Sequence, residues 1–241
     1  MTERQIIICR DAPDLSRRAA EQFVAMARQT LGAHGRFTVA LSGGSTPKGL
    51  YALLAAAEFA SRIDWARVHL FWGDERCVPP DHPESNYRMV QEALLSKIEI
   101  PSANVHRMTG EDEPARAAAR YEGELRQLLP LRSGVPSFDL ILLGLGEDGH
   151  TASLFPGSAA LTERARWVAH TWVEKLDSHR LTLTIPVINN AAQVSFLVSG
   201  AGKAAIVKEI LTDSASRYPA AQIRPAHGRL CWIISEDAYR P

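Results

Sequence analysis

Short apolar runs alternate with amphipathic stretches of helical length along the whole chain, and this alternation limits the possible folds more than any other feature. We expect strands at residues 5–9, 37–41, 68–72, 138–143, 167–172, 180–185, 194–198 and 230–234. We expect helices at residues 14–31, 47–60, 85–97, 114–129 and 203–211. Strands that alternate with helices predict an α/β fold with a mostly parallel sheet between helices.

The chain is expected to form one domain over residues 1–241. It contains no Pro/Gly/Ser-rich linker, no repeat and no low-complexity segment. The run Leu-Ile-Leu-Leu at residues 140–143 fits a strand that is covered on both faces. Ligands of such sheets bind beyond the carboxyl ends of the strands, so the loops that follow the strands are where chemistry is expected.

Charge and cysteine content exclude several classes of protein. The 27 Lys and Arg residues balance 27 Asp and Glu residues, and no run of five like charges occurs, so we expect no nucleic-acid partner. No apolar stretch approaches the roughly 20 residues of a membrane span, and the apolar run near the N-terminus is too short for a signal sequence. Cys9, Cys77 and Cys231 are too far apart for a disulfide framework or a zinc site. A cytoplasmic protein is expected.

The first informative loop, residues 41–47, follows a predicted strand and opens a predicted helix. Gly43 and Gly44 allow the backbone to approach an anion, and the start of the helix offers free N–H groups. Hydroxyl donors are added by Ser42, Ser45 and Thr46. This pattern favours a phosphate site, although an ordinary turn capped by Thr46, with Pro47 as the first helical residue, would look similar. It is not a nucleotide-binding P-loop, because Leu50 stands where that motif requires lysine.

Charged residues crowd into the second loop, directly after the apolar run 68–72. Asp74 and Arg76 are expected to face a pocket because they follow the end of a strand. The alternative is a solvated loop with local Asp–Arg pairing, which contributes little energy.

The third loop, residues 144–156, contains G-x-G-x-x-G but does not predict a dinucleotide site. Pro156 interrupts the segment within two turns, so the long helix required by that fingerprint does not follow. The glycines instead present Asp148 and His150 at the edge of the sheet. A histidine beside carboxylates is suited to general base catalysis.

Two isolated cations, Arg180 and Lys203, begin a predicted strand and a predicted helix. Either is an ordinary surface charge when taken alone, but together with the first loop they suit a phosphate dianion. The spacing of the other histidines gives no metal-binding pattern, and no G-x-S-x-G elbow is present. We therefore expect no metal and no cofactor. These other histidines are His34, His69, His82, His106, His170, His179 and His227.

Taken together, these loops resemble the 6-phosphogluconolactonase family, within the larger group that includes glucosamine-6-phosphate isomerase. The matching segments are LSGGSTPKGLY (41–51), FWGDERCVPPDHPESNYRM (71–89), FDLILLGLGEDGHTASLFPGS (138–158), HRLTLT (179–184) and GAGKA (200–204). The resemblance implies a Rossmann-like α/β fold. It also implies hydrolysis of 6-phospho-D-glucono-1,5-lactone to 6-phosphogluconate, the second step of the oxidative pentose phosphate pathway, without metal or nucleotide.

Carried over by motif, the resemblance implies a role for each candidate residue. His150 is the implied catalytic base, and Asp74 and Arg76 would line the lactone. Either Asp74 or Asp148 would orient the imidazole. The substrate phosphate would be bound by Ser42, Gly43, Gly44, Ser45 and Thr46, with Arg180 and Lys203 as its cations.

Two alternative functions fit these candidate residues less well. The related sugar-phosphate isomerase and deaminase has a pattern similar to D-G-H-I-A-F-N-E-P, in which a Glu follows the His by five residues. Phe155 stands at that position here. A non-catalytic sugar-phosphate sensor would have no reason to keep Asp74, Arg76 and His150 together. The expected partner is a small sugar phosphate lactone, with the chain a monomer or a weak homo-oligomer.

Overall fold

A parallel sheet forms the centre of the molecule. The computed structural model describes residues 3–213 and 215–239. Within them the strand order is β1-β12-β11-β8-β2-β3-β5, and every neighbouring pair is parallel. The strands are β1 (Glu3–Cys9), β12 (Arg229–Ser235), β11 (Gln193–Val198), β8 (Leu140–Leu143), β2 (Phe37–Leu41), β3 (Val68–Trp72) and β5 (Val105–His106).

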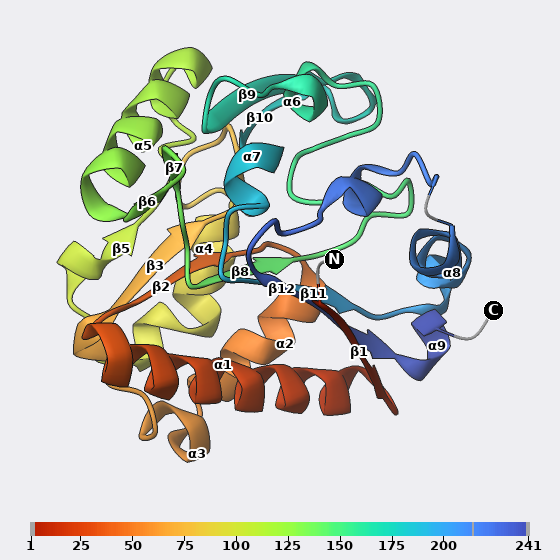
Figure 1. The fold of residues 1–241 in the computed structure, drawn as a ribbon. Coiled ribbons are helices and arrows are strands. Elements are labelled where there is room, and N and C mark those ends of the chain that lie inside the picture. Colours follow the sequence, from red (N-terminus) through yellow and green to blue (C-terminus); the bar gives the residue numbers. More distant parts are fainter. Residues whose placement is uncertain (1–2, 214, 240–241) are drawn as a thin grey trace.

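Helices and a second sheet cover the central sheet. In Figure 1, α1 (Ala12–His34) and α2 (Ser45–Leu54) lie below it, while α5 (Pro114–Leu128) and α7 (Ile185–Ile188) lie above. The other described helices are α3 (Ala57–Ala60), α4 (Asn86–Ala93), α6 (Ala159–Thr162), α8 (Ala204–Thr212) and α9 (Glu236–Tyr239). This is the expected α/β fold with a mostly parallel sheet.

The core explains why these segments form strands and helices. Every residue of β2, β8 and β11 is buried, as expected for strands that are covered on both faces. On α1, buried residues recur at helical spacing, and Phe23 meets Phe37 of β2 edge to face with 5.4 Å between ring centroids. α1 begins where Asp11 accepts the backbone N–H of Asp14 at 2.8 Å, and it ends at Gly35 in the left-handed conformation.

The expected helix over residues 47–60 is wrong in two respects. The chain forms α2 and then α3, with Ala56 extended between them. The break places the fully buried Phe59 close to α1. α2 also begins two residues earlier than expected, with Gly44 and not Thr46 at the N-cap position.

Three strands form a separate antiparallel sheet in the order β4-β10-β9. They are β4 (Asp74–Arg76), β10 (Ser178–Leu183) and β9 (Val168–Val173), so the expected loop at residues 74–76 is a strand. A short 3₁₀ turn, Glu174–Leu176, joins β9 to β10, a connection that is possible only between antiparallel strands. Two further short strands, β6 (Leu131–Arg132) and β7 (Val135–Pro136), pair with each other as a third, antiparallel sheet.

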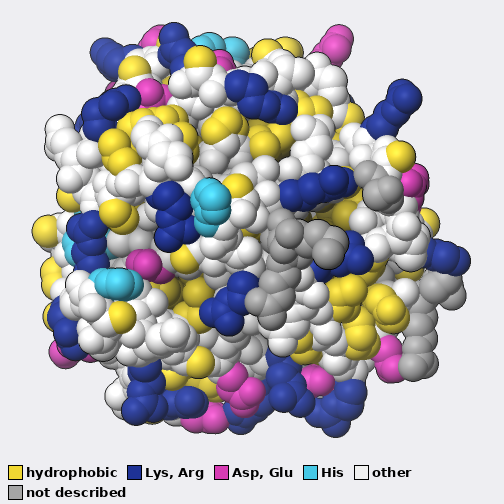
Figure 2. All heavy atoms as spheres, viewed as in Figure 1, with side chains coloured by type: hydrophobic (Ala, Val, Ile, Leu, Met, Phe, Trp, Pro, Cys, Tyr) yellow, Lys and Arg dark blue, Asp and Glu magenta, His cyan; other side chains and the backbone are white. Residues whose placement is uncertain are grey.

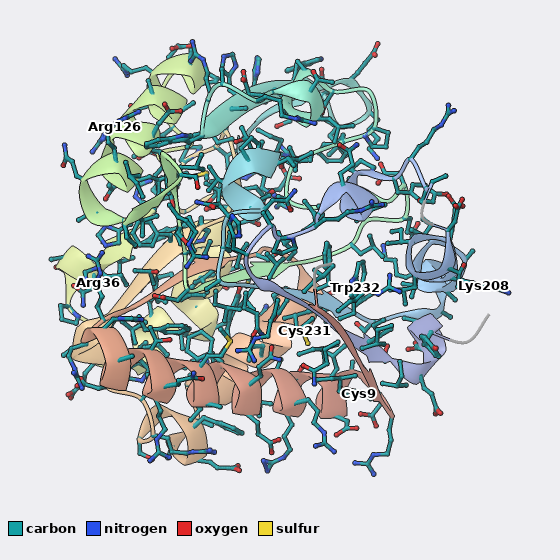
Figure 3. The ribbon with its side chains drawn as sticks, viewed as in Figure 1. Cys9, Arg36, Arg126, Lys208, Cys231 and Trp232 are labelled. Carbon is teal, nitrogen blue, oxygen red and sulfur yellow. The ribbon has the colours of Figure 1, made fainter. Side chains whose placement is uncertain are left out.

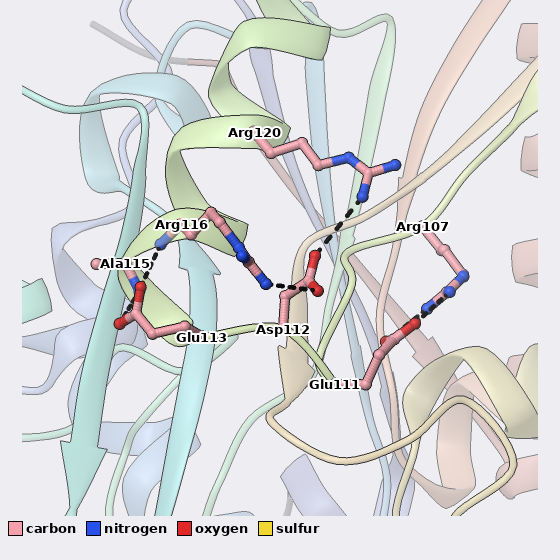
Figure 4. A network of polar contacts seen from close by, with 7 residues as sticks. All are labelled: Arg107, Glu111, Asp112, Glu113, Ala115, Arg116 and Arg120. Atoms are coloured by element: carbon pink, nitrogen blue, oxygen red, sulfur yellow. Dashed lines mark hydrogen bonds and ion pairs between the residues drawn. The ribbon is translucent and has the colours of Figure 1, made fainter.

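Polar contacts anchor α5, which packs against this second sheet. Glu113 caps the helix by accepting the backbone N–H groups of Ala115 and Arg116 (Figure 4). Asp112 pairs with Arg116 and Arg120, as Figure 4 also shows. These contacts are local and fix the start of α5.

The surface carries charges of both signs. In Figure 2, Lys and Arg side chains are scattered among acidic, hydrophobic and uncharged ones on the face shown. Among residues 3–213 and 215–239, none of the helices has the length and apolar character needed to cross a membrane.

Candidate active site

A cavity of about 390 Å³ lies beyond the carboxyl ends of β2, β8 and β11, where β4 and β10 border it. Of the residues expected to form a site, only Asp148 does not line this cavity, and it lies directly behind His150. The lining includes Ser42, Gly43, Gly44, Ser45, Thr46, Asp74, Arg76, His150, Arg180 and Lys203. The topology therefore brings together residues from five separate segments of the sequence.

The glycine-containing loop presents the start of α2 to the cavity. Gly44 has φ 99°, a conformation that favours glycine, and no side chain caps the helix. The first N–H groups of a helix have no partner within it, so they remain able to bind an anion. The hydroxyl of Thr46 lies 2.7 Å from that of Ser199, which follows β11, so it joins two strand ends instead of capping the helix.

Tyr51 fixes the backbone of Ser42, the residue that follows β2 at the start of this loop. Its buried hydroxyl accepts the Ser42 N–H at 3.0 Å and donates to the Ser42 carbonyl at 2.8 Å. Burial raises the pKa of Tyr51 well above its usual value, so the hydroxyl stays protonated and keeps both bonds. The loop is therefore fixed before any ligand binds.

Asn86 packs against Gly43 of the glycine-containing loop and is hydrogen-bonded to β4. Its amide donates to the carbonyl of Asp74 at 2.9 Å and to the carboxylate of Asp74 at 3.3 Å. The other oxygen of that carboxylate accepts the Ser153 hydroxyl at 2.7 Å. A Cβ atom at Gly43 would lie 1.9 Å from the Asn86 side-chain oxygen, so any other residue there must displace the Asn86 side chain. Asp74 thus lies in a fixed hydrogen-bond network, 8% exposed.

Glu75, between the two candidate residues of β4, serves a structural purpose. Its buried carboxylate accepts the N–H groups of Asn86 and Tyr87, each at 2.7 Å, and the hydroxyl of Ser85 at 3.1 Å. Burial raises the pKa of Glu75, although these bonds act in the opposite direction. Glu75 holds the beginning of α4. Because successive residues of a strand point to opposite faces, its side chain points away from the face that carries Asp74 and Arg76.

Two guanidinium groups lie side by side in the second sheet. Arg180 is paired in register with Arg76, so both side chains lie on the face that borders the cavity. Arg180 is 5% exposed, and burial together with the charge of Arg76 lowers its pKa. Its guanidinium donates to the Ser178 hydroxyl at 2.6 Å. Two neighbouring cations, of which Arg180 is buried, favour an anion between them.

Lys203 adds a third positive charge. It ends the turn Ala201–Lys203 after β11 and lines the same cavity. Its ammonium lies 4.0 Å from the exposed carboxylate of Glu147, a distance at the limit of an ion pair. Because the Glu147 carboxylate is exposed and the contact is long, the pair contributes little to stability, and Lys203 is available to a ligand.

His150 and Asp148 form the pair of groups most suited to proton transfer. Nδ1 of His150 lies 2.5 Å from Oδ1 of Asp148, and the Phe155 ring stacks on the imidazole with 4.2 Å between centroids. Lys175 binds the other oxygen of Asp148. Burial acts to raise the pKa of Asp148, but the hydrogen bonds from Lys175 and His150 outweigh it and hold the pKa far below its usual value. An ionised carboxylate at Nδ1 keeps the proton there and leaves Nε2 free to accept one.

Sequence reasoning missed several residues of the site, namely Asn86, Ser153, Lys175 and Ser199. Ser199 follows a strand directly, and this position was a signal that could have identified it. The other three depend on contacts between distant segments. Among the residues that the structure describes, there is no group of three or more His, Cys, Asp or Glu side chains arranged to hold a metal.

Comparison with known families gives one match that spans most of the chain. Residues 10–232 match the model of the family described as glucosamine-6-phosphate isomerases/6-phosphogluconolactonase. A Synechocystis protein named 6-phosphogluconolactonase is 48% identical over 208 residues, which cover 85% of this chain and 84% of the relative. A Haemophilus influenzae protein of the same name is 43% identical over 204 residues, with 84% and 86% covered.

A solved structure agrees over nearly the whole fold. The 6-phosphogluconolactonase from Trypanosoma brucei superimposes with a TM-score of 0.89 at 31% sequence identity. The superposition covers 99% of this chain and 98% of the other, so it includes every segment that contributes to the cavity.

Proposed function

The chain belongs to the family of glucosamine-6-phosphate isomerases and 6-phosphogluconolactonases, and from this premise we propose that it hydrolyses 6-phospho-D-glucono-1,5-lactone to 6-phospho-D-gluconate with a water molecule activated by His150. The observation that carries the proposal is the hydrogen bond between His150 and Asp148 at the wall of a cavity that the start of α2, Arg180 and Lys203 also line. Relatives that carry this activity in their names match over more than four fifths of the chain.

In the proposed mechanism, Nε2 of His150 removes a proton from a water molecule as its oxygen attacks C1 of the lactone. The carbonyl electrons move to oxygen, and the C1–ring oxygen bond breaks when the intermediate collapses. The imidazolium then returns its proton to the ring oxygen, so the water is fully incorporated in the product. Proton transfer by a positioned side chain contributes typically about 10²–10⁴-fold to the rate.

Arg76 is the proposed donor to the negative oxygen that forms on C1. Its guanidinium borders the cavity, and one of its nitrogens donates to the Glu84 carbonyl, which restricts its position. A fixed donor that needs no rearrangement during the reaction is the most effective kind of transition-state stabilisation. Asp74 would bind the sugar hydroxyl groups, since it is ionisable and held by Ser153 and Asn86.

Asp148 is proposed as the carboxylate that orients His150. It contacts the imidazole directly, whereas the oxygens of Asp74 are bonded to Ser153 and Asn86. The geometry therefore favours Asp148 over Asp74 for this role.

The substrate phosphate is proposed to bind at the start of α2. Ser42, Gly43, Gly44, Ser45 and Thr46 would supply N–H and hydroxyl donors, and Arg180 and Lys203 would supply charge. Because the formal net charge of the chain is zero, these groups must attract the phosphate locally. Binding the phosphate orients the reacting carbon at the other end of the substrate.

Phe155 argues against the isomerase and deaminase activity of the same family. It stacks on His150 at the position where the isomerase pattern has an acid. An aromatic ring cannot supply the proton that ring opening needs. The lactonase reaction needs no such acid, because the imidazolium itself protonates the leaving oxygen.

We also propose that residues 1–241 form one domain that works in the cytoplasm without a metal or cofactor. Support for one domain comes from a single cluster of buried apolar residues that includes strands from both ends of the described chain. The free thiols of Cys9, Cys77 and Cys231 suit a reducing compartment, and burial raises the pKa of Cys77 to about 11. A monomer or weak homo-oligomer is consistent with a cavity that residues of one chain line.

The proposed function is tested by following 6-phosphogluconate formation from freshly generated lactone with a coupled dehydrogenase, corrected for spontaneous hydrolysis. Enzyme-dependent hydrolysis well above the spontaneous rate is expected. A crystal soaked with 6-phosphogluconate is expected to place the phosphate at residues 42–46 and C1 beside His150. Hydrolysis at the spontaneous rate, or the opposite orientation of the product, would contradict the proposal.

A further inference from the structure

Lys175 closes a ring of four contacts around the His150–Asp148 pair. Its ammonium binds Oδ2 of Asp148 and lies 4.9 Å from the centre of the Phe155 ring. Phe155 stacks on His150 with 4.2 Å between ring centroids, and His150 returns to Asp148 through Nδ1. Each of the four side chains therefore contacts two of the others.

Lys175 comes from a different part of the chain than the other three members of this ring. Asp148, His150 and Phe155 all come from the segment that follows β8, whereas Lys175 comes from the turn between β9 and β10. It is therefore the member that ties the loop of the catalytic pair to the second sheet. The β9–β10 turn borders the cavity through both Lys175 and Leu176.

Stability does not explain the contact between Lys175 and Asp148. The lysine side chain is 53% exposed and the aspartate side chain is 31% exposed. Ion pairs at this level of exposure contribute about 0–1 kcal/mol to folding. A contact with so little value for stability, at this location, points to a role in the site itself.

On the basis of the proposed function, we propose that Lys175 is a positioning residue for the lactonase reaction. By binding Oδ2 it fixes the rotation of the Asp148 carboxylate, so that Oδ1 stays on Nδ1 of His150. Its contact with Phe155 holds the ring that supports the imidazole from the side. Together these contacts keep Nε2 of His150 directed at the reacting water, a role that requires no contact between Lys175 and the substrate.

The test compares three variants with the parent enzyme in steady-state lactone hydrolysis. Lys175→Met keeps the length of the side chain and removes its charge, while Lys175→Arg keeps the charge. Lys208→Met is the matched control, because Lys208 projects from α8 away from the molecule (Figure 3) and does not line the cavity. In metalloenzymes, residues that orient a metal-bound histidine from behind typically contribute about 10- to 100-fold to activity. By analogy, we expect Lys175→Met to lower kcat by about 10- to 100-fold.

The kinetic result that supports the proposal is a lower kcat with a KM within about twofold of the parent, together with recovery in Lys175→Arg. Unchanged kcat in Lys175→Met would overturn it. So would a raised KM at constant kcat, which would make Lys175 a substrate ligand. An equal loss in both variants, accompanied by a lower Tm, would mean a structural role and would also overturn it.

A spectroscopic measurement separates this inference from the proposed function. Long-range ¹H–¹⁵N spectra of the His150 imidazole report which nitrogen carries the proton and how fast that proton exchanges. We expect faster exchange of the Nδ1 proton in Lys175→Met than in the parent and in Lys208→Met. If the parent enzyme does not hydrolyse the lactone, the proposed function fails, and the exchange rates still decide whether Lys175 positions His150; identical rates would overturn that role.

Discussion

Oδ1 of Asp148 lies 2.5 Å from Nδ1 of His150 and also accepts the backbone N–H of His150 at 3.2 Å. The two bonds hold the aspartate against both the ring and the backbone of the histidine. The imidazole can then turn only by breaking its bond to the carboxylate. The orientation of Nε2 is thus a consequence of the short sequence Asp148-Gly149-His150 and of the left-handed turn at Gly149.

Replacement of His150 by alanine is expected to abolish catalysis without preventing product binding. The substitution removes the proposed base, while the phosphate-binding groups on α2, β10 and the segment after β11 remain. Lactone hydrolysis should fall to the spontaneous rate, and calorimetry should still detect 6-phosphogluconate. Hydrolysis at the parent rate would exclude His150 as the base.

Replacement of Asp148 by asparagine is expected to lower kcat by about 10²–10⁴-fold. An amide that donates to Nδ1 stabilises the wrong tautomer, in which Nε2 carries the proton and cannot accept another. KM should change little, because Asp148 lies behind His150 and does not line the cavity. A large rise in KM at constant kcat would mean that Asp148 contacts the substrate instead.

The low pKa of Asp148 also predicts how stability depends on pH. Burial acts to raise this pKa from its ordinary value of 3.8, but the hydrogen bonds from Lys175 and His150 lower it further than burial raises it. Since the unfolded chain then binds a proton more readily than the folded one, Asp148 stabilises the fold above about pH 4 and less so as the pH falls. The difference in Tm between the parent and Asp148→Asn should therefore narrow between pH 6 and pH 3. A constant difference would contradict the lowered pKa.

Local sequence pattern was sufficient for every strand of the central sheet except β5, whose two residues were not expected to form a strand. The apolar runs 37–41 and 68–72 became β2 and β3 with the same bounds, because charged or turn-forming residues flank each run. The α2–α3 break was missed because the sequence around Ala56 contains no glycine or proline that would end a helix. That break follows from the packing of Phe59 in the core, which is a tertiary effect.

The loops of the site could be predicted where they follow parallel strands. Ser42 follows β2 directly and His150 lies in the loop that follows β8, so topology alone brings these loops to one edge of the sheet. β4 was expected to be a loop, because its pairing with β10 joins residues about a hundred positions apart. The contact between Lys175 and Asp148 depends on the path of the β9–β10 turn, which no local pattern shows.

Removal of either proposed phosphate cation is expected to raise KM more than it lowers kcat. Arg180→Ala and Lys203→Ala remove charge that is proposed to bind the phosphate, and they leave the His150–Asp148 pair unchanged. The larger rise in KM should come from Arg180→Ala, because that guanidinium is 5% exposed and poorly screened. Lys208→Ala serves as a control for charge loss elsewhere. If KM is unchanged in both variants, the phosphate does not bind where we propose.

The last prediction concerns a single methyl group at Gly43. A Cβ atom there would lie 1.9 Å from the side-chain oxygen of Asn86, so Gly43→Ala must displace that side chain. Its bonds to the carbonyl and carboxylate of Asp74 would be lost, and with them the fixed distance between the glycine-containing loop and β4. We expect a loss of activity of at least about tenfold, comparable to a misplacement of reacting groups by a fraction of an ångström.

The matched control for this methyl group is Gly123→Ala in the middle of α5. A Cβ at Gly123 meets nothing within 4 Å, so the same chemical change should keep full activity and stabilise the helix by about 0.5–1 kcal/mol. Steady-state kinetics and urea unfolding of the two variants measure both effects. Full activity in Gly43→Ala would show that Asn86 can move without disturbing Asp74, and the rigid connection between the glycine-containing loop and β4 would then not be needed for catalysis.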